Sequence, residues 1–184
     1  MRKTVLVPVA DGIEELEAVA IIDILRRAGA EVTVAAVTQR LDIVCSRGVK
    51  LTADTFLGDC KESDYDLVAL PGGLPGAEHL RDSRELTAIL ERQRQKNALY
   101  AAICASPVVV LEHHGLLAGR QATCHPGFSE HLVDRQQAAS RVVVDGNCIT
   151  SQGPGTAVEF ALTLVEQLFG TDRRTTVATP MVTT

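Results

Sequence analysis

The sequence has few aromatic residues and no tryptophan. Aromatic side chains make up 3% of its 184 residues, so the core must be built from Val, Leu, Ile and Ala. The same scarcity argues against a surface on which the bases of single-stranded nucleic acids stack. The formal net charge of −5 points the same way, because nucleic-acid-binding domains normally carry a basic patch. We therefore expect no nucleic-acid partner.

Long apolar runs are also missing. No run approaches the roughly 20 apolar residues that a membrane-spanning helix requires. The N-terminus passes from Arg2-Lys3 into one short apolar stretch and then to Asp11 and Glu14. Such a start is too short and too soon acidic for a secretory signal peptide. These observations predict a cytoplasmic protein with no membrane partner.

The cysteines follow no pairing or metal-binding pattern. There are five, with no Cys-x-x-Cys among them: Cys45, Cys60, Cys104, Cys124 and Cys148. An odd number without that spacing argues against a disulfide framework and against a structural zinc site. We expect reduced thiols, of which at least one matters for its reactivity.

Strands and helices are predicted to alternate along the chain. They cover residues 4–9 (strand), 13–28 (helix), 31–37 (strand), 66–70 (strand), 83–96 (helix), 99–103 (strand) and 106–112 (helix). This alternation is typical of α/β proteins with a largely parallel sheet. Short strands are expected near 43–44 and 49–51, a hairpin over 141–150, and a long apolar helix over 153–169. No repeat or linker divides the sequence, so we predict one domain over residues 1–184.

The segment around Cys104 carries the strongest chemical signal. The apolar strand predicted over residues 99–103 runs directly into Cys104, and a helix with Pro107 in its first turn follows at once. A sharp strand-to-helix turn of this kind exposes a nucleophile, and a small neighbour such as Ala105 fits so tight a turn. The N-terminus of the following helix favours a thiolate. The alternative is a buried structural cysteine, because free cysteines are among the most buried residues.

A glycine-rich turn follows another predicted strand. Residues 71–76 read Pro-Gly-Gly-Leu-Pro-Gly. Gly72 and Gly73 allow the backbone to approach a ligand and to point N–H groups into a cavity, as an oxyanion hole requires. The turn lacks the Gly-Lys-Ser/Thr signature of a phosphate-binding loop. A plain tight turn is the alternative.

Glutamates lie at the start of the first predicted helix. Helical spacing of apolar residues predicts a buried stripe made of Leu16, Val19, Ala20 and Ile24. Glu17 follows the first of these residues, at the edge of the stripe, where its carboxyl group could face inward. Beside a thiolate such a group is pushed toward protonation and could donate a hydrogen bond or act as an acid–base group. The alternative is a solvated glutamate.

His125 is predicted to lie at the same edge of the sheet. The residues Cys124-His125-Pro126 are expected to end a strand, and sites in parallel sheets form beyond the carboxyl ends of strands. His125 is then either a general base for Cys104 or a loop histidine without a catalytic role. Cys104, Cys124 and His125 have no spacing typical of metal ligands, so we predict no metal site.

Five segments together identify a family. They lie at residues 14–18, 45–49, 70–73, 101–105 and 150–156. In this order and spacing, the sequence resembles the ThiJ/PfpI superfamily, and within it the DJ-one branch. The likeness extends over about residues 3–182. Each segment alone is a weak signal, whereas the combination is highly specific.

The resemblance implies a fold and a reactive centre. The fold would be a flavodoxin-like three-layer α/β sandwich with a mostly parallel central sheet, assembled as a homodimer. Cys104 would be the nucleophile at its elbow. Glu17 would be its carboxyl partner, protonated and hydrogen-bonded to the sulfur. His125 matches a histidine close to the cysteine in this branch, and Cys45 matches a cysteine at the dimer interface.

The resemblance also implies the surroundings of the sulfur. Backbone N–H groups of Gly73 and Ala105, next to Gly72, would form the oxyanion pocket. Arg47 would lie near the site and the dimer seam. Protease-like relatives carry a histidine immediately after the cysteine, whereas this sequence has Ala105 there. That departure argues against proteolysis.

Two functions follow from one reactive thiol. The first is a glyoxalase or deglycase that needs no cofactor and no glutathione. Cys104 would attack the aldehyde of a 2-oxoaldehyde such as methylglyoxal or glyoxal, or act on early adducts of these aldehydes, giving a 2-hydroxy acid. The second is an oxidative-stress sensor or redox-regulated chaperone that acts through oxidation of Cys104. The expected partner of the site is a small reactive carbonyl compound or a glycated adduct.

Overall fold

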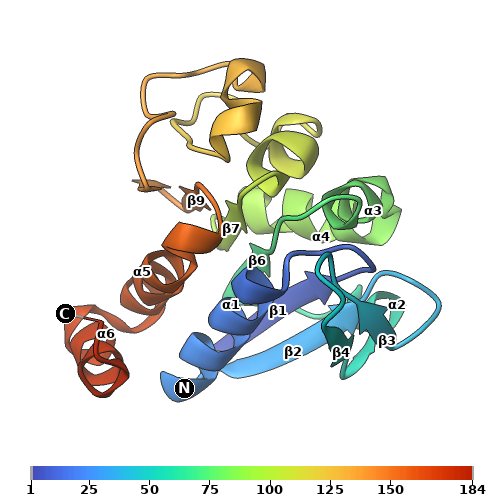
Figure 1. The fold of residues 1–184 in the computed structure, drawn as a ribbon, viewed down its shortest axis with the longest axis horizontal. Coiled ribbons are helices and arrows are strands. Elements are labelled where there is room, and N and C mark those ends of the chain that lie inside the picture. Colours follow the sequence, from blue (N-terminus) through green and yellow to red (C-terminus); the bar gives the residue numbers. More distant parts are fainter. Residues whose placement is uncertain (1, 184) are drawn as a thin grey trace.

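The computed structural model describes residues 2–183 and contains a central sheet between helices (Figure 1). In this range the sheet has seven strands in the order β5-β2-β1-β6-β7-β9-β8. They are β1 Thr4–Val9, β2 Glu31–Ala36, β5 Thr55–Phe56, β6 Leu67–Leu70, β7 Leu99–Ile103, β8 Val142–Asp145 and β9 Cys148–Ser151. Neighbouring strands pair in parallel, except that β8 runs antiparallel to β9. A separate antiparallel pair consists of β3 (Asp42–Val44) and β4 (Lys50–Thr52).

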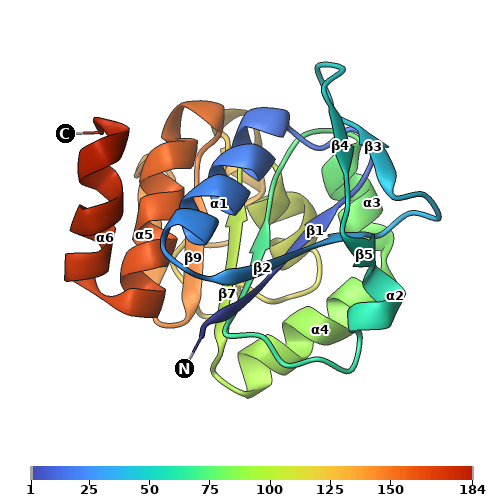
Figure 2. The same ribbon diagram turned by 90° about the horizontal axis from the view of Figure 1, so that it is seen from below.

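Helices cover both faces of the sheet. The α-helices are α1 Glu15–Arg27, α2 Leu57–Cys60, α3 Gly76–Asp82, α4 Arg84–Gln95, α5 Ala157–Phe169 and α6 Thr171–Ala178. Figure 2 shows α1 and α5 side by side on one face, with α6 outside α5, and α3 and α4 on the other. The predicted three-layer α/β sandwich with a mostly parallel sheet is therefore confirmed. Among residues 2–183, no helix is both long and apolar enough to cross a membrane.

The core is aliphatic, as the shortage of aromatic residues predicts. Every residue of β6 is buried, and so is every residue of β1 after Thr4. Strands buried on both faces read as nearly continuous apolar runs, because helices cover the sheet on each side. Tyr100 and Phe160 are the aromatic residues with fully buried side chains in the described chain.

The predicted buried stripe of α1 is right at Ile24, which is 1% exposed, but wrong at Leu16 and Val19, which are 63% and 45% exposed. The face that packs against the sheet and α5 instead carries Glu17, Ala18, Ile21 and Leu25. Helix α1 therefore has a second apolar face that the other described residues leave exposed.

Several other elements differ from the prediction in their bounds or in their presence. The helix predicted over 83–96 begins at Arg84, because the side chain of Ser83 accepts a hydrogen bond from the Leu86 N–H and caps the helix. The helix α3 was not predicted. The strand predicted to end at His125 is absent, since residues 121–125 join no strand pair and lead into a 3-10 helix at Pro126–His131.

Candidate active site

Cys104 lies at a strained turn at the carboxyl end of β7. Its φ angle is +67°, in the left-handed region that side chains other than glycine rarely adopt. The turn is fixed from both sides: the Cys104 N–H donates to Ser151 O at 3.0 Å, and the Cys104 carbonyl accepts from the His125 N–H at 2.8 Å. A helical segment, Pro107–Glu112, follows directly. This geometry is that of the predicted nucleophile elbow.

Glu17 lies beneath this elbow and is completely buried. Its Oε2 accepts a hydrogen bond from the Gly72 N–H at 2.7 Å. Its Oε1 is buried without a nitrogen or oxygen donor among the described residues, and the Cys104 side chain contacts the carboxyl group. Burial raises the pKa of Glu17 from 4.5 to about 7, against the opposing effect of the Gly72 hydrogen bond. The inward-facing alternative for Glu17 is therefore correct.

The groups around the Cys104 sulfur shift the pKa of its thiol in opposite directions. Burial, the negative charge of Glu17 and the hydrogen bond with Glu17 raise the pKa of the Cys104 thiol to about 12. Hydrogen bonds from the backbone N–H groups of Gly73 and Ala105 work to lower it. The predicted effect of the helix N-terminus is thus present at Ala105, but burial and Glu17 outweigh it.

Glu17 and Cys104 must be considered as one titrating pair. Two of the causes that raise the pKa of the thiol involve Glu17: its negative charge and its hydrogen bond. Protonation of Glu17 removes that charge. A protonated carboxyl group instead donates a hydrogen bond to a thiolate and stabilises it. The unpartnered Oε1 is the oxygen available to carry that proton. If the pair holds a single proton and Glu17 carries it, the sulfur is a thiolate beside a neutral acid.

The turn after β6 packs tightly against this pair. A Cβ atom added to Gly72 would lie 2.5 Å from Cys104 Cβ, 2.8 Å from Ile103 O and 2.9 Å from Glu17 Oε2. Gly73 has a φ of +89° and carries one of the N–H groups that face the sulfur. Residue 72 must therefore be glycine because neighbouring atoms leave no room for a Cβ, and residue 73 must be glycine because of its left-handed backbone.

A cavity of about 310 Å³ opens above the sulfur. The structure brings the following predicted site residues together in its wall: Arg47, Gly73, Cys104, Ala105 and His125. Gly72 and Glu17 are absent from the wall; they lie behind it, at the base of the elbow. All the residues predicted for the site thus lie at one edge of the sheet.

Arg47 is held in this wall through its backbone. The Arg47 N–H donates to Glu15 Oε1 at 2.8 Å, and the Ser46 hydroxyl donates to Glu15 Oε2 at 3.0 Å. Burial works to raise the pKa of Glu15, but a hydrogen bond from its own backbone N–H, together with those from Ser46, Val49 and Arg47, outweighs burial and lowers that pKa. Glu15 is therefore an anion that positions the turn carrying Arg47.

His125 is exposed and follows an extended segment rather than a strand. Its Nδ1 accepts a hydrogen bond from the Gly127 N–H at 3.1 Å. Within the described residues, no hydrogen bond joins the imidazole to the sulfur of Cys104. The histidine lies in the cavity as predicted, but not in contact with the thiol as a general base would be.

Three contributors to the site were not predicted. Ser106 is fully buried and donates to Pro71 O at 2.6 Å, which ties the elbow to the glycine turn. Glu14 caps α1 by accepting from the Glu17 N–H at 2.8 Å. A Cβ added to Gly153 would lie 4.0 Å from Cys104 Sγ, so this glycine borders the sulfur. Ser106 and Gly153 act through contacts between distant segments that a pattern of spacing does not reveal, whereas Glu14 acts locally, at the start of α1.

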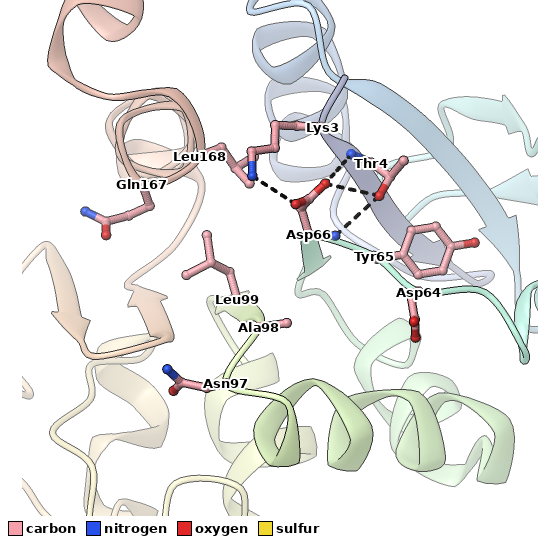
Figure 3. A pocket seen from close by; sticks show the side chains of 10 residues that line it. All are labelled: Lys3, Thr4, Asp64, Tyr65, Asp66, Asn97, Ala98, Leu99, Gln167 and Leu168. Carbon is pink, nitrogen blue, oxygen red and sulfur yellow. Dashed lines mark hydrogen bonds and ion pairs between the residues drawn. The ribbon is translucent and has the colours of Figure 1, made fainter. Parts of the chain in front are cut away.

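A second cavity, of about 420 Å³, lies at the other edge of the sheet (Figure 3). Its wall includes Lys3 and Asp66, which form an ion pair at 2.9 Å, and residues that precede β7. These positions are at the amino ends of the strands, whereas Cys104 follows a carboxyl end. None of the predicted site residues lies there. In residues 2–183, no group of three or more His, Cys, Asp or Glu side chains is arranged to hold a metal ion.

The fold and the site define an α/β sandwich with a cysteine at a strand-to-helix elbow. A model of the DJ-1/PfpI family matches residues 3–167. The chain therefore belongs to the DJ-1/PfpI family, which confirms the resemblance stated from its motifs.

Relatives found by sequence and by structure agree with this assignment. Protein DJ-1 homolog B of Arabidopsis thaliana is 52% identical over 169 residues, which are 92% of this chain but 39% of that longer protein. The glutathione-independent glyoxalase DJR-1.2 of Caenorhabditis elegans is 34% identical, with 96% of this chain and 94% of that protein covered. The structure of oxidized DJ-1 from Toxoplasma gondii has a TM-score of 0.96 at 46% identity, with 98% of each chain covered. The family thus includes a protein named as an enzyme.

Proposed function

We propose that this protein is a glyoxalase that uses Cys104 and no cofactor to convert 2-oxoaldehydes into 2-hydroxy acids. Methylglyoxal and glyoxal, or the early adducts that they form with amines and thiols, are the substrates. The observation that carries this proposal is the buried Glu17 against Cys104, because a carboxyl group that can hold a proton lies beside the thiol at the base of one small cavity.

Addition of the thiolate begins the reaction. The sulfur attacks the aldehyde carbon, and the carbonyl oxygen becomes an alkoxide. The N–H groups of Gly73 and Ala105, which hydrogen-bond the sulfur, then donate to this oxygen. Glu17 then gives its proton to the alkoxide. The product is a hemithioacetal, and Glu17 is left as a carboxylate.

Rearrangement and hydrolysis complete the turnover. The Glu17 carboxylate takes the hydrogen of the former aldehyde carbon as a proton and returns it to the neighbouring carbon. The hydroxyl proton moves to the second oxygen, so that the hemithioacetal becomes a 2-hydroxy thioester. Water hydrolyses the thioester to the 2-hydroxy acid and releases the sulfur. No electrons are gained or lost overall, since the reaction adds one water to the substrate.

The size of the cavity and the relatives support this chemistry. A volume of about 310 Å³ suits a small aldehyde. The Caenorhabditis elegans relative is named a glutathione-independent glyoxalase, and that activity is proposed here for this chain. Arg47, exposed in the cavity wall, is proposed to attract the carboxylate product or an anionic adduct.

Lactate formation from methylglyoxal tests the proposal. Wild type should produce lactate, and Cys104→Ala should reduce the rate to the uncatalysed level. Cys60→Ala is the control, because Cys60 is also a free thiol but is buried in α2, outside the cavity. Equal rates in wild type and Cys104→Ala would refute the assignment of the nucleophile.

A redox role is the second candidate, and the same thiol would carry it. The Toxoplasma gondii relative was solved in an oxidized form. Cys104 is half-buried, whereas Cys60 and Cys148 are buried. We propose that mild peroxide oxidises Cys104 first, as expected of an oxidative-stress sensor or redox-regulated chaperone. Peptide mass spectrometry after graded peroxide tests this; equal oxidation of all three cysteines contradicts it.

We also propose that a second copy of the chain covers the exposed apolar face of α1. A groove of about 380 Å³ runs along this face. Its wall includes the apolar residues Leu16, Val19, Ala20, Ile24, Val49, Ala157, Val158 and Met181. Pro154 lines both this groove and the cysteine cavity, so a partner in the groove would border the site. This arrangement agrees with the homodimer that the motifs imply.

Sedimentation velocity of wild type and Leu16→Lys tests the dimer. Wild type should sediment as a dimer and the variant as a monomer, because a buried ammonium group would oppose association. Val133→Lys is the control, since Val133 is 87% exposed and lies outside the groove. A monomeric wild type would refute the dimer, and a dimeric Leu16→Lys would refute this face as its interface.

A further inference from the structure

The wall of the cysteine cavity carries apolar side chains that take no part in the proposed chemistry. Leu74, Phe128 and Pro154 line it together with Cys104. Leu74 is 47% exposed. A single exposed leucine is common on protein surfaces and needs no explanation. Three apolar side chains from three separate segments, gathered beside one nucleophile, instead form a surface that the apolar part of a ligand can cover.

Leu74 is held close to the sulfur by the residue before it in the chain. Leu74 directly follows Gly73, whose N–H hydrogen-bonds the sulfur of Cys104. A Cβ added to Gly73 would overlap Glu14 N, so this backbone lies against the start of α1. The Gly73 carbonyl accepts from the Ala77 N–H at 2.8 Å. These contacts keep the backbone at Leu74 in place beside the elbow.

Phe128 is held by the short 3-10 helix Pro126–His131. Its N–H donates to the His125 carbonyl at 2.8 Å. Its ring meets the His125 ring edge to face, with centroids 6.3 Å apart and an interplanar angle of 75°. The side chain is partly buried and also packs against the hydrophobic core. Because the ring is already held in place, little conformational entropy is lost when a ligand covers it.

The position of the reacting aldehyde decides which part of a substrate meets this surface. In the proposed reaction the aldehyde carbon bonds to Cys104, and its oxygen accepts from the N–H groups of Gly73 and Ala105. The second carbon of the 2-oxoaldehyde then extends from the elbow into the remaining space of the cavity. It carries a carbonyl oxygen and a substituent, which is a hydrogen in glyoxal and a methyl group in methylglyoxal. The substituent is the part of the molecule whose size and polarity can vary.

We infer that Leu74 and Phe128 form a subsite that selects 2-oxoaldehydes with an apolar substituent on the second carbon. This inference deepens the proposed glyoxalase function and depends on it. The wall has a polar part as well, with Glu14, Ser46 and Arg47, which suits the second carbonyl oxygen. A volume of about 310 Å³ is at the lower end of the range for ligand pockets, so it accommodates a group larger than methyl. Alkyl and aryl glyoxals are the preferred class.

The expected preference follows from the burial of apolar surface. Full burial of one methylene group favours binding by about four-fold. Leu74 and Phe128 belong to one wall and cover the substituent from that side, so part of this factor is lost to water. We therefore expect kcat/KM to rise by about two- to four-fold for each methylene group added to the substituent.

Kinetics of 2-hydroxy acid formation from methyl-, ethyl- and propylglyoxal test the preference. Wild-type kcat/KM should rise along the series by this factor for each methylene group. Leu74→Asn introduces a polar side chain of similar shape at an exposed position and should flatten the series. Val133→Asn is the control and should keep the wild-type rise, because Val133 is 87% exposed and lies outside the cavity wall. A flat series in wild type, or the full rise in Leu74→Asn, would overturn the inference.

Alkylation of Cys104 by N-methyl-, N-ethyl- and N-propyliodoacetamide tests the subsite without turnover. The sulfur displaces iodide from the CH₂ group, and the alkyl group on the amide nitrogen extends into the cavity. Peptide mass spectrometry follows the reaction at Cys104, and each rate is divided by that of glutathione with the same reagent. The wild-type rate should rise with the length of the alkyl group, and the Leu74→Asn rate should not. Equal rates for the three reagents in wild type would overturn the subsite.

The two proposals fail in different ways. If wild type forms no 2-hydroxy acid from any of the glyoxals, the proposed function fails, although the alkylation rates still report whether the wall binds an alkyl group. If wild type is active and Cys104→Ala is not, the function stands, and a flat series in wild type refutes only the subsite.

Discussion

Replacing Glu17 with glutamine should change how the free energy of unfolding varies with pH. Glutamine has the shape of the neutral acid but does not ionise. In wild type, burial raises the pKa of Glu17 from 4.5 to about 7, so the folded chain holds the proton more tightly than the unfolded chain. The stability that this proton provides is complete below pH 4.5 and declines as the pH rises through 7.

The size of the effect follows from the same two values. The rise of the pKa from 4.5 to about 7 corresponds to roughly 3 kcal/mol of stability that wild type loses over this interval. Glu17→Gln should not lose it. The variant should therefore gain about 3 kcal/mol relative to wild type between pH 4.5 and pH values above 7. The amide introduced by this substitution also keeps a donor beside the sulfur.

Urea unfolding at a series of pH values across this interval is the assay. The quantity of interest is the difference in unfolding free energy between variant and wild type, because other titrating groups cancel in it. Glu91→Gln, on the exposed part of α4, is the control for the exchange of a glutamate for a glutamine. A pH-independent difference for Glu17→Gln would refute the raised pKa and with it the protonated partner of the thiol.

Three further substitutions test the packing around the sulfur. Gly72→Ala should destabilise the fold by several kcal/mol in urea unfolding, because its methyl group meets three atoms closer than 3.0 Å; wild-type stability would contradict that crowding. Ser106→Ala should cost about 1–3 kcal/mol by leaving the Pro71 carbonyl unpaired, and an unchanged midpoint would contradict this. Gly153→Ala adds a methyl group beside the sulfur and should lower kcat/KM for phenylglyoxal more than for the smaller glyoxal. Gly155→Ala, whose methyl group meets open space, is the control and should lower neither value. Equal losses for the two substrates in Gly153→Ala would exclude Gly153 as a limit on substrate size.

The parts of the fold that follow from local pattern were predictable. Alternating apolar strands and amphipathic helices specify a parallel sheet, and the strand-to-helix turn at Cys104 is visible in the residue order alone. The phase of α1 was not predictable, because the helix has apolar residues on two faces. Spacing identifies Leu16 and Val19 as apolar but does not say that α5 and the sheet cover the other face, which carries Glu17.

Contacts between distant segments account for most of what the sequence did not show. The Ser106 hydroxyl meets Pro71, and Gly153 meets the sulfur, only because β6, β7 and β9 are neighbours in the sheet. His125 was placed correctly at the site, although the strand expected before it is absent. What holds the histidine there is one backbone hydrogen bond to the elbow, which no periodicity predicts.

The left-handed backbone at Cys104 costs the folded state stability at the one residue whose side chain carries the proposed chemistry. Glycine would adopt its φ of +67° without penalty, whereas a residue with a Cβ pays roughly 1–2 kcal/mol to remain there. Selection for thermal stability alone would therefore favour glycine at this position and erase the thiol. A variant library screened only for heat resistance should drift toward an inert protein with the same fold. The cysteine persists in such a library only when turnover or redox response is selected together with stability.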